Sequence, residues 1–330
     1  MGKNILIFRT DRIGDLIVTC PAIITIKKYF ENSNITLIAS DKNFEYAKNL
    51  DIFDCVYKFP KNNIFNKIIF IYKLTKKTYD YIFVFDGKDR SILTSALIKS
   101  GLKVALKSKN KLYYKNIKIK FFDDSEKTNL NDVFQKMLDY SEVNEKINNY
   151  QFLVNKKDNN FSSKINIKNY IHIHLDEKWL NKMYIKTYTN IYPAFDDFIS
   201  FLNKISEKNQ VLITTGIHDF DLLKNLRNNY FNKIDDKIFY KNNKNNSIFL
   251  IFKPSFDDLE SLLRKTKTLI SCHGALTHAA NSFNIKNVDI LEESRVGFYK
   301  KFTSYLKNYN PIYRSEFTNL SNTLLKIIDE

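Results

Sequence analysis

Glycine is scarce in this sequence, and the spacing of the few glycines excludes two common nucleotide-binding motifs. Seven glycines occur among 330 residues. None is arranged as Gly-x-Gly-x-x-Gly, which binds dinucleotides, or as Gly-x-x-x-x-Gly-Lys-Ser/Thr, which cradles nucleotide phosphates. The sequence therefore argues against a dinucleotide-dependent dehydrogenase and against a P-loop ATPase. Three of the glycines, Gly14, Gly216 and Gly274, follow segments that we expect to be strands.

Cysteines and long apolar runs are scarce as well. Cys20, Cys55 and Cys272 are too few and too far apart for a disulfide framework or a zinc cluster, so we expect reduced, packed side chains. The apolar residues come in short bursts that never reach the roughly eighteen positions of a membrane-spanning helix. The first residues lack the apolar core and cleavage site of a signal peptide. These features predict a cytoplasmic protein.

The sequence carries an excess of positive charge, with a formal net charge of +16. A basic surface raises the local concentration of nucleic acid, anionic lipid or phosphorylated substrate. The excess is mostly lysine interspersed with asparagine and isoleucine, a composition that biased codon usage also produces. The basic residues form no single block or nucleic-acid recognition motif. We therefore expect no nucleic-acid partner, and peripheral contact with an anionic membrane surface, at the inner face of the cell membrane, fits the charge better.

The length and the 44% hydrophobic content favour two domains rather than one. A buried strand at 5–9 is followed by a polar turn at 10–15 and by helical spacing from 16 to 30. Pro21 falls within that helical stretch, so the helix either begins near Thr19 or bends there. The alternation continues with helices at 43–50, 64–76 and 130–140 and with strands at 35–39, 55–59, 81–85 and near Val104.

A polar, lysine-rich stretch at 155–169 is a candidate linker that contributes little to a core. We predict domains at 1–155 and 156–330, each α/β with a parallel sheet covered by helices on both faces. Such sheets bind ligands at the carboxyl ends of their strands, so two of them facing each other would form a nucleotide-sized central cleft. The second domain has expected strands at 170–175, 211–215, 248–252, 268–271 and 288–291 and helices at 194–206, 220–227, 256–265, 275–283 and 320–328.

Asp15 lies at the first strand–helix turn and is the best candidate for a general base. A carboxylate there is at the edge of the sheet, where it can reach a bound hydroxyl. The alternative is that Asp15 caps the helix by accepting backbone N–H bonds. Arg9, Asp11 and Arg12 add charge at the same turn, either to neutralise a phosphate or as ion pairs in a solvated loop.

A second candidate site is the segment 271–278, Ser-Cys-His-Gly-Ala-Leu-Thr-His, which follows a strand and opens a helix. Its backbone N–H groups and the helix dipole suit a diphosphate. His273 and His278 flank the turn, but no matching ligand stands at suitable spacing, so we expect no zinc site. His172 and His174 share one face of an earlier strand, and packing is the default explanation for both. His174 is nearer the carboxyl end of that strand and the expected cleft.

The tripeptide Asp219-Phe220-Asp221 has the Asp-x-Asp pattern that binds a divalent cation in metal-dependent sugar transferases. It follows Gly216 at the start of a helical stretch, where acidic residues interact favourably with the helix dipole. The helix explanation is the stronger one, and a ribose contact from Asp219 stays open.

The sequence ILIFRTDRIGDLI at 5–17, continuing to Pro21, resembles the opening of glycosyltransferase family 9, the heptosyltransferases. The family's second signature is Asp-Thr-Gly-x-x-His before an alanine-rich helix. Here the residues 273–278, His-Gly-Ala-Leu-Thr-His, stand in its place, and the last histidine and the following alanines match. The resemblance covers both halves of the chain in the right order. It implies a GT-B fold, with acceptor binding by residues 1–155 and nucleotide-sugar binding by residues 156–330.

By this resemblance the protein is an inverting, metal-independent glycosyltransferase that uses a nucleotide-diphosphate sugar and no further cofactor. Asp15 would be the general base that takes the proton from an acceptor hydroxyl. Lys178 would compensate the charge of the leaving nucleoside diphosphate, and Lys182 and Lys186, in an apparent insertion at 180–190, are alternatives for that contact. The other donor-binding residues would be Thr10, Arg12, Gly14, His174, Gly216, Asp219, His273, Gly274, Ala275, Leu276 and His278.

The implied substrates are a heptose or related sugar and an acceptor in the lipopolysaccharide core or another cell-surface glycan. The departure from Asp-Thr-Gly at 273–275 leaves the donor open to sugars other than ADP-heptose. Two other functions stay open: a nucleotide-sugar-binding protein without catalysis, and a metal-dependent transferase that uses Asp219 and Asp221. The apolar and basic helix at 64–70 is expected to pack in the core, and contact with an anionic membrane is the alternative.

Overall fold

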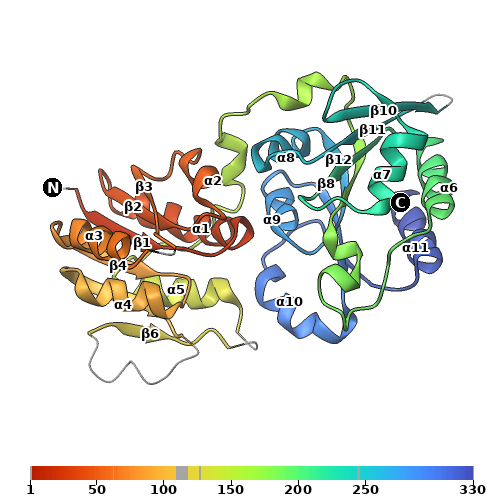
Figure 1. Ribbon diagram of the computed structural model, residues 1–330. Helices are drawn as coiled ribbons and strands as arrows, with labels where there is room; N and C mark the ends of the chain where they lie inside the picture. Colours follow the sequence, from red (N-terminus) through yellow and green to blue (C-terminus); the bar gives the residue numbers. More distant parts are fainter. Residues whose placement is uncertain (1, 62, 109–117, 126–127, 244–245, 330) are drawn as a thin grey trace. The chain divides into compact units, whose positions relative to one another are not determined.

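The computed structural model describes residues 2–61, 63–108, 118–125, 128–243 and 246–329. The chain divides into two compact units (Figure 1). Unit 1 comprises Met1–Phe152 and Lys300–Tyr305, and unit 2 comprises Leu153–Tyr299 and Leu306–Glu330. Among the described residues, no helix has the length and apolar character needed to cross a membrane.

Unit 1 is built on a parallel sheet of six strands in the order β3-β2-β1-β4-β5-β6. Helix α1 packs against α5, and α3 packs against α4, as expected when right-handed crossovers place helices on both faces of a doubly wound sheet. The strands are β1 (Asn4–Phe8), β2 (Asn34–Ala39), β3 (Cys55–Lys58), β4 (Tyr79–Val84), β5 (Ser100–Leu106) and β6 (Lys120–Phe122), and the helices are α1 (Ile13–Tyr29), α2 (Phe44–Lys48), α3 (Ile64–Thr75), α4 (Asp89–Leu97) and α5 (Leu130–Tyr140).

Helix α1 begins at Ile13, so of the two alternatives for Pro21 the helix start near Thr19 is wrong. Its first turn is stabilised by Asp15, whose side chain accepts a hydrogen bond from the backbone N–H of Arg12 at 3.1 Å. Pro21 lies inside the helix, where it lacks an N–H to donate. One turn later the hydroxyl of Thr25 donates to the carbonyl of Pro21 at 2.9 Å. The apolar residues around Pro21 are buried, and this packing holds the helix together through the proline.

Unit 2 contains a sheet of eight strands in the order β14-β13-β12-β7-β8-β11-β10-β9. The expectation of a purely parallel sheet is wrong at one edge, where β10 pairs antiparallel with both β11 and β9. The opposite outer strand, β14 (Tyr309–Tyr313), contains Pro311. The remaining strands are β7 (Tyr170–Leu175), β8 (Val211–Thr215), β9 (Asn232–Lys233), β10 (Ile238–Asn243), β11 (Asn246–Ile251), β12 (Thr266–Cys272) and β13 (Lys286–Leu291).

The helices of unit 2 follow the strands as the sequence predicts, with one addition near its end. Helix α10 (Val296–Thr303) was not expected and runs from unit 2 into the short segment assigned to unit 1. The others are α6 (Phe195–Ser206), α7 (Asp221–Asn225), α8 (Phe256–Leu263), α9 (Ala275–Ser282) and α11 (Phe317–Asp329). The α/β class and the two Rossmann-like sheets are confirmed. The assignment of residues 1–155 to the acceptor and 156–330 to the donor stays a prediction.

The composition of the polar stretch at 155–169 predicted a linker that contributes little to a core. In the structure this stretch packs against unit 2. Phe161, Ile165 and Ile167 are buried in a cluster with β7, β8 and α8. The side chain of Lys156 is also buried, and its ammonium group pairs with Asp257 and Glu260. The apolar residues that alternate with the lysines therefore decide the structure of this segment.

The order of the strands shows where each sheet can hold a ligand. The chain order reverses between β1 and β4 in unit 1, and between β7 and β12 in unit 2. At such a reversal the connecting loops leave in opposite directions, which opens a crevice at the carboxyl ends of the two strands. The segments at these two positions are 9–12 with 85–88, and 176–178 with 272–274.

Candidate functional site

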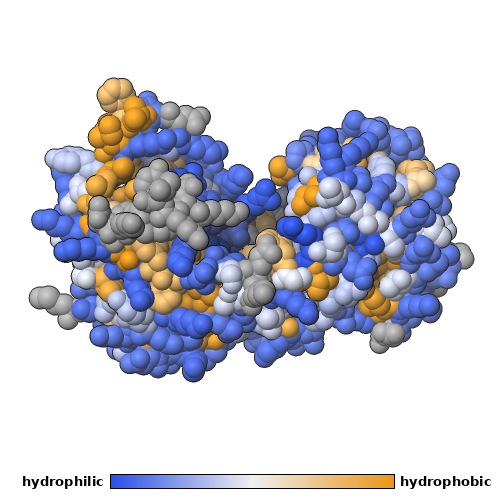
Figure 2. All heavy atoms as spheres, turned by 90° about the horizontal axis from the view of Figure 1, so that it is seen from below, coloured by the Kyte–Doolittle hydropathy of each residue, from blue (hydrophilic) through white to orange (hydrophobic). Residues whose placement is uncertain are grey.

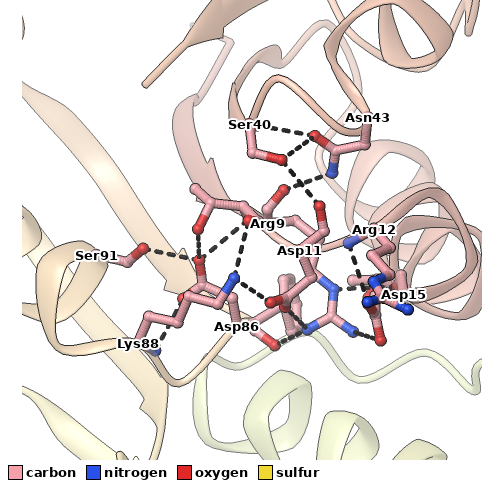
Figure 3. Close-up of polar contacts among 12 residues, drawn as sticks. Arg9, Asp11, Arg12, Asp15, Ser40, Asn43, Asp86, Lys88 and Ser91 are labelled. Carbon is pink, nitrogen blue, oxygen red and sulfur yellow. Dashed lines mark hydrogen bonds and ion pairs between the residues drawn. The ribbon is translucent and has the colours of Figure 1, made fainter. Parts of the chain in front are cut away.

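In unit 1, the buried guanidinium group of Arg9 joins the ends of β1, β4 and helix α1 (Figure 3). Its Nε donates to the carbonyl of Asp15 at 3.0 Å, and its Nη1 donates to the carbonyl of Phe85. The same guanidinium group pairs with the carboxylate of Asp11 at 3.2 Å. Arg9 is therefore engaged within the protein, and its role is to fix the corner rather than to meet a phosphate.

The end of β4 contributes a second carboxylate, Asp86, which organises the same corner (Figure 3). It accepts hydrogen bonds from the backbone and the hydroxyl of Thr10, at 3.1 and 2.6 Å, and from Ser91 at 2.7 Å. Lys88 reaches the carbonyl of Thr10 at 2.9 Å and also pairs with Asp11. Sequence reasoning missed Asp86 and Lys88. The available signal was Gly87, a glycine soon after a buried strand, and the structure gives it a positive φ of 57°.

Asp15 is the exposed carboxylate of this corner. One oxygen accepts the Arg12 backbone N–H at 3.1 Å, and the other lies 3.7 Å from a guanidinium nitrogen of Arg9. The side chain keeps 38% of its surface exposed. The capping role that the sequence allowed is therefore present, and the carboxylate still faces solvent, where a hydroxyl can approach it.

Asp15 borders a cavity of about 620 Å³ at the carboxyl end of the sheet. The cavity is lined by both signs of charge. Asp41 pairs with Lys61 and with Lys58, the latter at 3.4 Å, and the hydrogen bond from Lys61 lowers the pKa of Asp41. The remaining walls of the cavity come from four segments of unit 1: Thr10, Asp11, Arg12, Ser40, Lys42, Phe59, Lys88, Asp89 and Arg90.

In unit 2, the ammonium group of Lys178 lies at the reversal between β7 and β12. It donates to the carbonyls of Cys272 at 3.2 Å and His273 at 3.0 Å and pairs with the buried carboxylate of Asp176 at 2.8 Å. Burial disfavours the charged form, but the carboxylate outweighs it and raises the pKa of Lys178 above its usual value. Lys178 therefore carries a fixed positive charge. Burial also raises the pKa of the neighbouring Cys272 thiol, to about 12.

The turn before α9 is organised by Asp289, a fully buried carboxylate on β13. It accepts from Nδ1 of His273 at 2.8 Å, from the Tyr309 hydroxyl at 2.9 Å and from the Thr277 hydroxyl at 3.2 Å. The Nδ1 bond fixes the orientation of the His273 ring and leaves its other nitrogen without a role in this network. The ring of His278 packs edge-on against His273 at 5.2 Å between centroids.

The histidines of β7 are held in neutral form. The Thr214 hydroxyl lies between them, 2.7 Å from Nε2 of His172 and 2.9 Å from Nδ1 of His174. Burial lowers the pKa of His172 to about 3 and that of His174 to about 4. The other nitrogen of His174 lies 3.6 Å from Asp176. His174 therefore supports the Lys178 turn and brings no positive charge of its own at neutral pH.

Comparison with known proteins gives relatives by structure alone. No protein-family model matches the sequence, and no curated protein matches it either. The E. coli heptosyltransferase WaaC with ADP matches 99% of this chain and 99% of its own, at 12% identity and a TM-score of 0.70. The glycosyl transferase family 9 protein from Veillonella parvula DSM 2008 matches 99% and 89%, at 12% identity and a TM-score of 0.67. The chain has the family 9 glycosyltransferase fold.

This fold is of the GT-B type, so the resemblance that the sequence motifs indicated is confirmed at the level of the fold. A UDP-GlcNAc 2-epimerase from Methanocaldococcus jannaschii matches 100% of this chain and 92% of its own, at 13% identity and a lower TM-score of 0.55. Related folds thus occur in proteins named for different reactions, and the reaction must be argued from the residues at the site.

The family 9 fold divides the predicted site residues between the two units. Thr10, Arg12 and Gly14 belong to unit 1, as Asp15 does, whereas the turn that bears Lys178 belongs to unit 2. The other predicted residues, Asp219 excepted, gather around the β7–β12 reversal. Gly216 belongs there because a Cβ at this position would lie 2.8 Å from that of Asp176.

Several predicted donor-binding side chains face the interior of unit 2. The side chains of Leu276 and His278 are buried, so only their backbone can meet a ligand directly. Asp219 forms a double hydrogen bond with Arg227, at 3.1 and 2.8 Å, whereas Asp221 is exposed and pairs with Lys224 at 3.5 Å. The two carboxylates of the Asp-x-Asp pattern thus have separate partners. Among the described residues, no group of three or more His, Cys, Asp or Glu side chains is placed to hold a metal ion.

Sequence reasoning also missed Arg314, which follows the outer strand β14. Its guanidinium group donates to the carbonyl of Lys178 at 2.9 Å and to the carbonyl of Thr189 at 2.7 Å. It therefore ties the far end of the insertion at 180–190 to the Lys178 turn. Lys182 and Lys186, the alternative diphosphate contacts, are exposed on this insertion.

Proposed function

We propose that the protein is a glycosyltransferase that moves a sugar from a nucleoside-diphosphate donor to a glycan acceptor. The observation that carries this proposal is the Lys178 ammonium group, held against the first residues of helix α9. A diphosphate leaving group gains negative charge as its bond to the sugar breaks. A fixed cation beside the N-terminus of a helix stabilises that charge without a metal.

In this proposal unit 2 binds the donor. Lys178 and the turn at 273–275 contact the diphosphate, and Asp289 holds the His273 ring in place beside it. The histidine and glycine at 273–274 stand where the family pattern has aspartate and threonine, so the group nearest the phosphates is different. A heptose or a related sugar remains the proposed donor, with the base of the nucleotide open.

Unit 1 binds the acceptor, and Asp15 is the proposed base. As the acceptor oxygen forms its bond to the anomeric carbon, the hydroxyl proton passes to the Asp15 carboxylate and the bond to the diphosphate oxygen breaks. Attack opposite the leaving group inverts the anomeric configuration. The mixed charges of the 620 Å³ cavity suit a polar, anionic glycan such as a lipopolysaccharide core. A lipid-borne acceptor would bring the protein to an anionic membrane surface from the cytoplasmic side.

A thermal-shift panel of nucleoside diphosphates tests the donor half of this proposal. A ligand present at a hundred times its dissociation constant stabilises the native state by about 2.7 kcal/mol. We expect one base to raise the melting temperature by several degrees and Lys178→Gln to remove most of that shift. If none of ADP, UDP, GDP and CDP changes the melting temperature, the proposed function is wrong. Binding without turnover of any activated sugar would favour the non-catalytic alternative.

A further inference from the structure

Helix α3 of unit 1 has apolar side chains on two opposite faces. Phe70 and Leu74, four residues apart, pack onto the sheet in a cluster with Phe59 and Ile92. The rings of Phe59 and Phe70 meet edge-on, with 5.6 Å between centroids. This inner face is sufficient to attach the helix, so the apolar residues of the other face have no part in the core of the unit.

The outer face of α3 carries large apolar side chains that are between 52% and 72% exposed. Exposed leucines of the adjacent helix α4 extend this surface, and Figure 2 shows apolar side chains protruding together at one corner of unit 1. A contiguous apolar area of this kind is uncommon on a soluble protein unless it binds something. We call it the α3–α4 ridge; its members are Ile64, Phe65, Ile68, Ile69, Tyr72, Leu93 and Leu97.

The charged residues on and next to helix α3 are of one sign. Between positions 61 and 77 the sequence contains five lysines and no acidic residue. The ammonium group of Lys76 lies 4.5 Å from the centre of the Tyr72 ring, and Lys73 is exposed on the same helix. Apolar and aromatic residues bordered by lysines are the pattern of helices that lie in the interface of an anionic bilayer.

We propose that the α3–α4 ridge is a docking surface for an anionic lipid bilayer. The helix lies in the plane of the headgroups, its outer apolar side chains enter the acyl boundary, and the lysines contact lipid phosphates. A second copy of this chain fits less well, because two such surfaces would bring ten lysines together in a dimer without any acidic partner on this segment.

Helix α3 adjoins the cavity that Asp15 borders, through its inner face rather than through the ridge. Phe59 lies in the cavity wall and contacts Phe70 of α3, and Arg90, in the first turn of α4, lies over the Phe59 ring at 5.4 Å. A bilayer bound to the ridge would hold lipid-borne glycans near the unit that contains the proposed acceptor site. This second step rests on the proposed function, whereas the lipid binding itself is measurable without it.

Vesicle flotation of the full chain tests the docking surface. We expect binding to phosphatidylglycerol vesicles and little binding to phosphatidylcholine vesicles. Ile68→Ser with Ile69→Ser should weaken binding about tenfold or more. Lys73→Gln with Lys76→Gln should weaken vesicle binding about tenfold, and the binding that remains should be less sensitive to salt. The matched control is Val154→Ser with Ile234→Ser, which removes two exposed apolar side chains from unit 2.

Three outcomes would overturn the inference. The wild type does not bind the vesicles, the Ile68/Ile69 variant binds them as well as the wild type does, or the control variant loses as much binding as the Ile68/Ile69 variant. A dimer in light scattering that the Ile68/Ile69 substitutions dissociate would assign the ridge to a second copy and also overturn it. Nucleotide binding measured on the same variants keeps the two proposals apart. A ridge variant that loses vesicles but keeps its nucleotide-induced thermal shift supports docking, and a wild type that binds vesicles but no nucleotide contradicts only the proposed transfer.

Discussion

The side-chain nitrogen of Lys178 lies 2.5 Å from the point that a Cβ on Gly274 would occupy. Residue 274 must therefore lack a side chain for the ammonium group to sit where it does. Its backbone is extended, with φ at 178°, so the requirement is one of space and not of backbone conformation. The lysine and the glycine work as a pair at the proposed diphosphate site.

Replacement of Gly274 by alanine should displace the Lys178 ammonium group. Because the end of a lysine side chain is flexible, we expect the free energy of unfolding to fall by only about 1 kcal/mol. The affinity for a nucleoside diphosphate should fall about tenfold, since a charge-assisted contact is misplaced. Calorimetric titration measures this. Gly297→Ala is the control, because nothing lies within 4 Å of its Cβ position. Unchanged affinity in Gly274→Ala would contradict the assignment of this site.

Replacement of Asp15 by asparagine separates its role as a helix cap from its proposed role as the general base. The amide oxygen can still accept the Arg12 N–H, so the start of α1 and the melting temperature should change little. A general base is lost, and sugar transfer should fall by about two to four orders of magnitude while nucleotide affinity persists. Transfer rates and thermal shifts on the same samples check both points. A variant that retains near wild-type turnover would show that another group takes the proton.

The Asp-x-Asp alternative predicts dependence on a divalent cation. Since Asp219 is bound to Arg227, we expect full transfer activity in excess chelator and in Asp221→Asn. Asp219→Asn should instead lower stability, by about 1–3 kcal/mol, because it leaves the Arg227 guanidinium group without its charged partner. If chelator removes the transfer activity and magnesium restores it, the metal-dependent alternative is supported.

The acid stability of unit 2 should depend on its buried histidines. Burial lowers the pKa of His172 to about 3 and of His174 to about 4, whereas the unfolded values are near 6.5. Between about pH 6.5 and 4 the unfolded state binds protons that the folded state does not. The free energy of unfolding should therefore fall as the pH falls, at up to about 1.4 kcal/mol per pH unit for each imidazole.

Urea unfolding at pH 7.5, 6 and 5 measures this slope. His172→Asn should make the slope shallower because one buried titrating group is removed. His218 is exposed, so His218→Gln should leave the slope as it is. Carboxylates that titrate in the same window affect all three proteins alike. Parallel curves for the wild type and His172→Asn would contradict the expectation.

Much of the fold could be predicted from the sequence because its buried strands are short, apolar and regularly spaced. The bounds expected for β7, β8 and α5 are those observed. Two of the strands that were missed have little of this signal: β10 carries a lysine and two asparagines at its exposed end, and β14 contains a proline. β14 is an outermost strand, with a partner on one side, and β10 lies next to the other edge, where only two of its residues pair with β9; polar residues are tolerated at such positions.

The candidate site was predictable where a single strand–helix turn carries it and not where distant segments meet. Asp15 and the 273–278 turn stand out locally, and the structure leaves their assigned roles as proposals. Asp86, Asp289 and Arg314 act through contacts to residues far away in the sequence, which no local pattern reveals. Helix α3 was expected to pack in the core. Its apolar residues, at 64, 65, 68–72 and 74, cover more than one face of the helix, so their spacing did not decide which face is left outside.

The two outermost strands of the eight-stranded sheet differ in how they resist further pairing. Strand β9 is two residues long, and Pro311 takes one amide donor away from β14. Neither border offers a continuous template for another chain. At high protein concentration we therefore expect that unit 2 does not form fibrils by adding strands at the edges of this sheet.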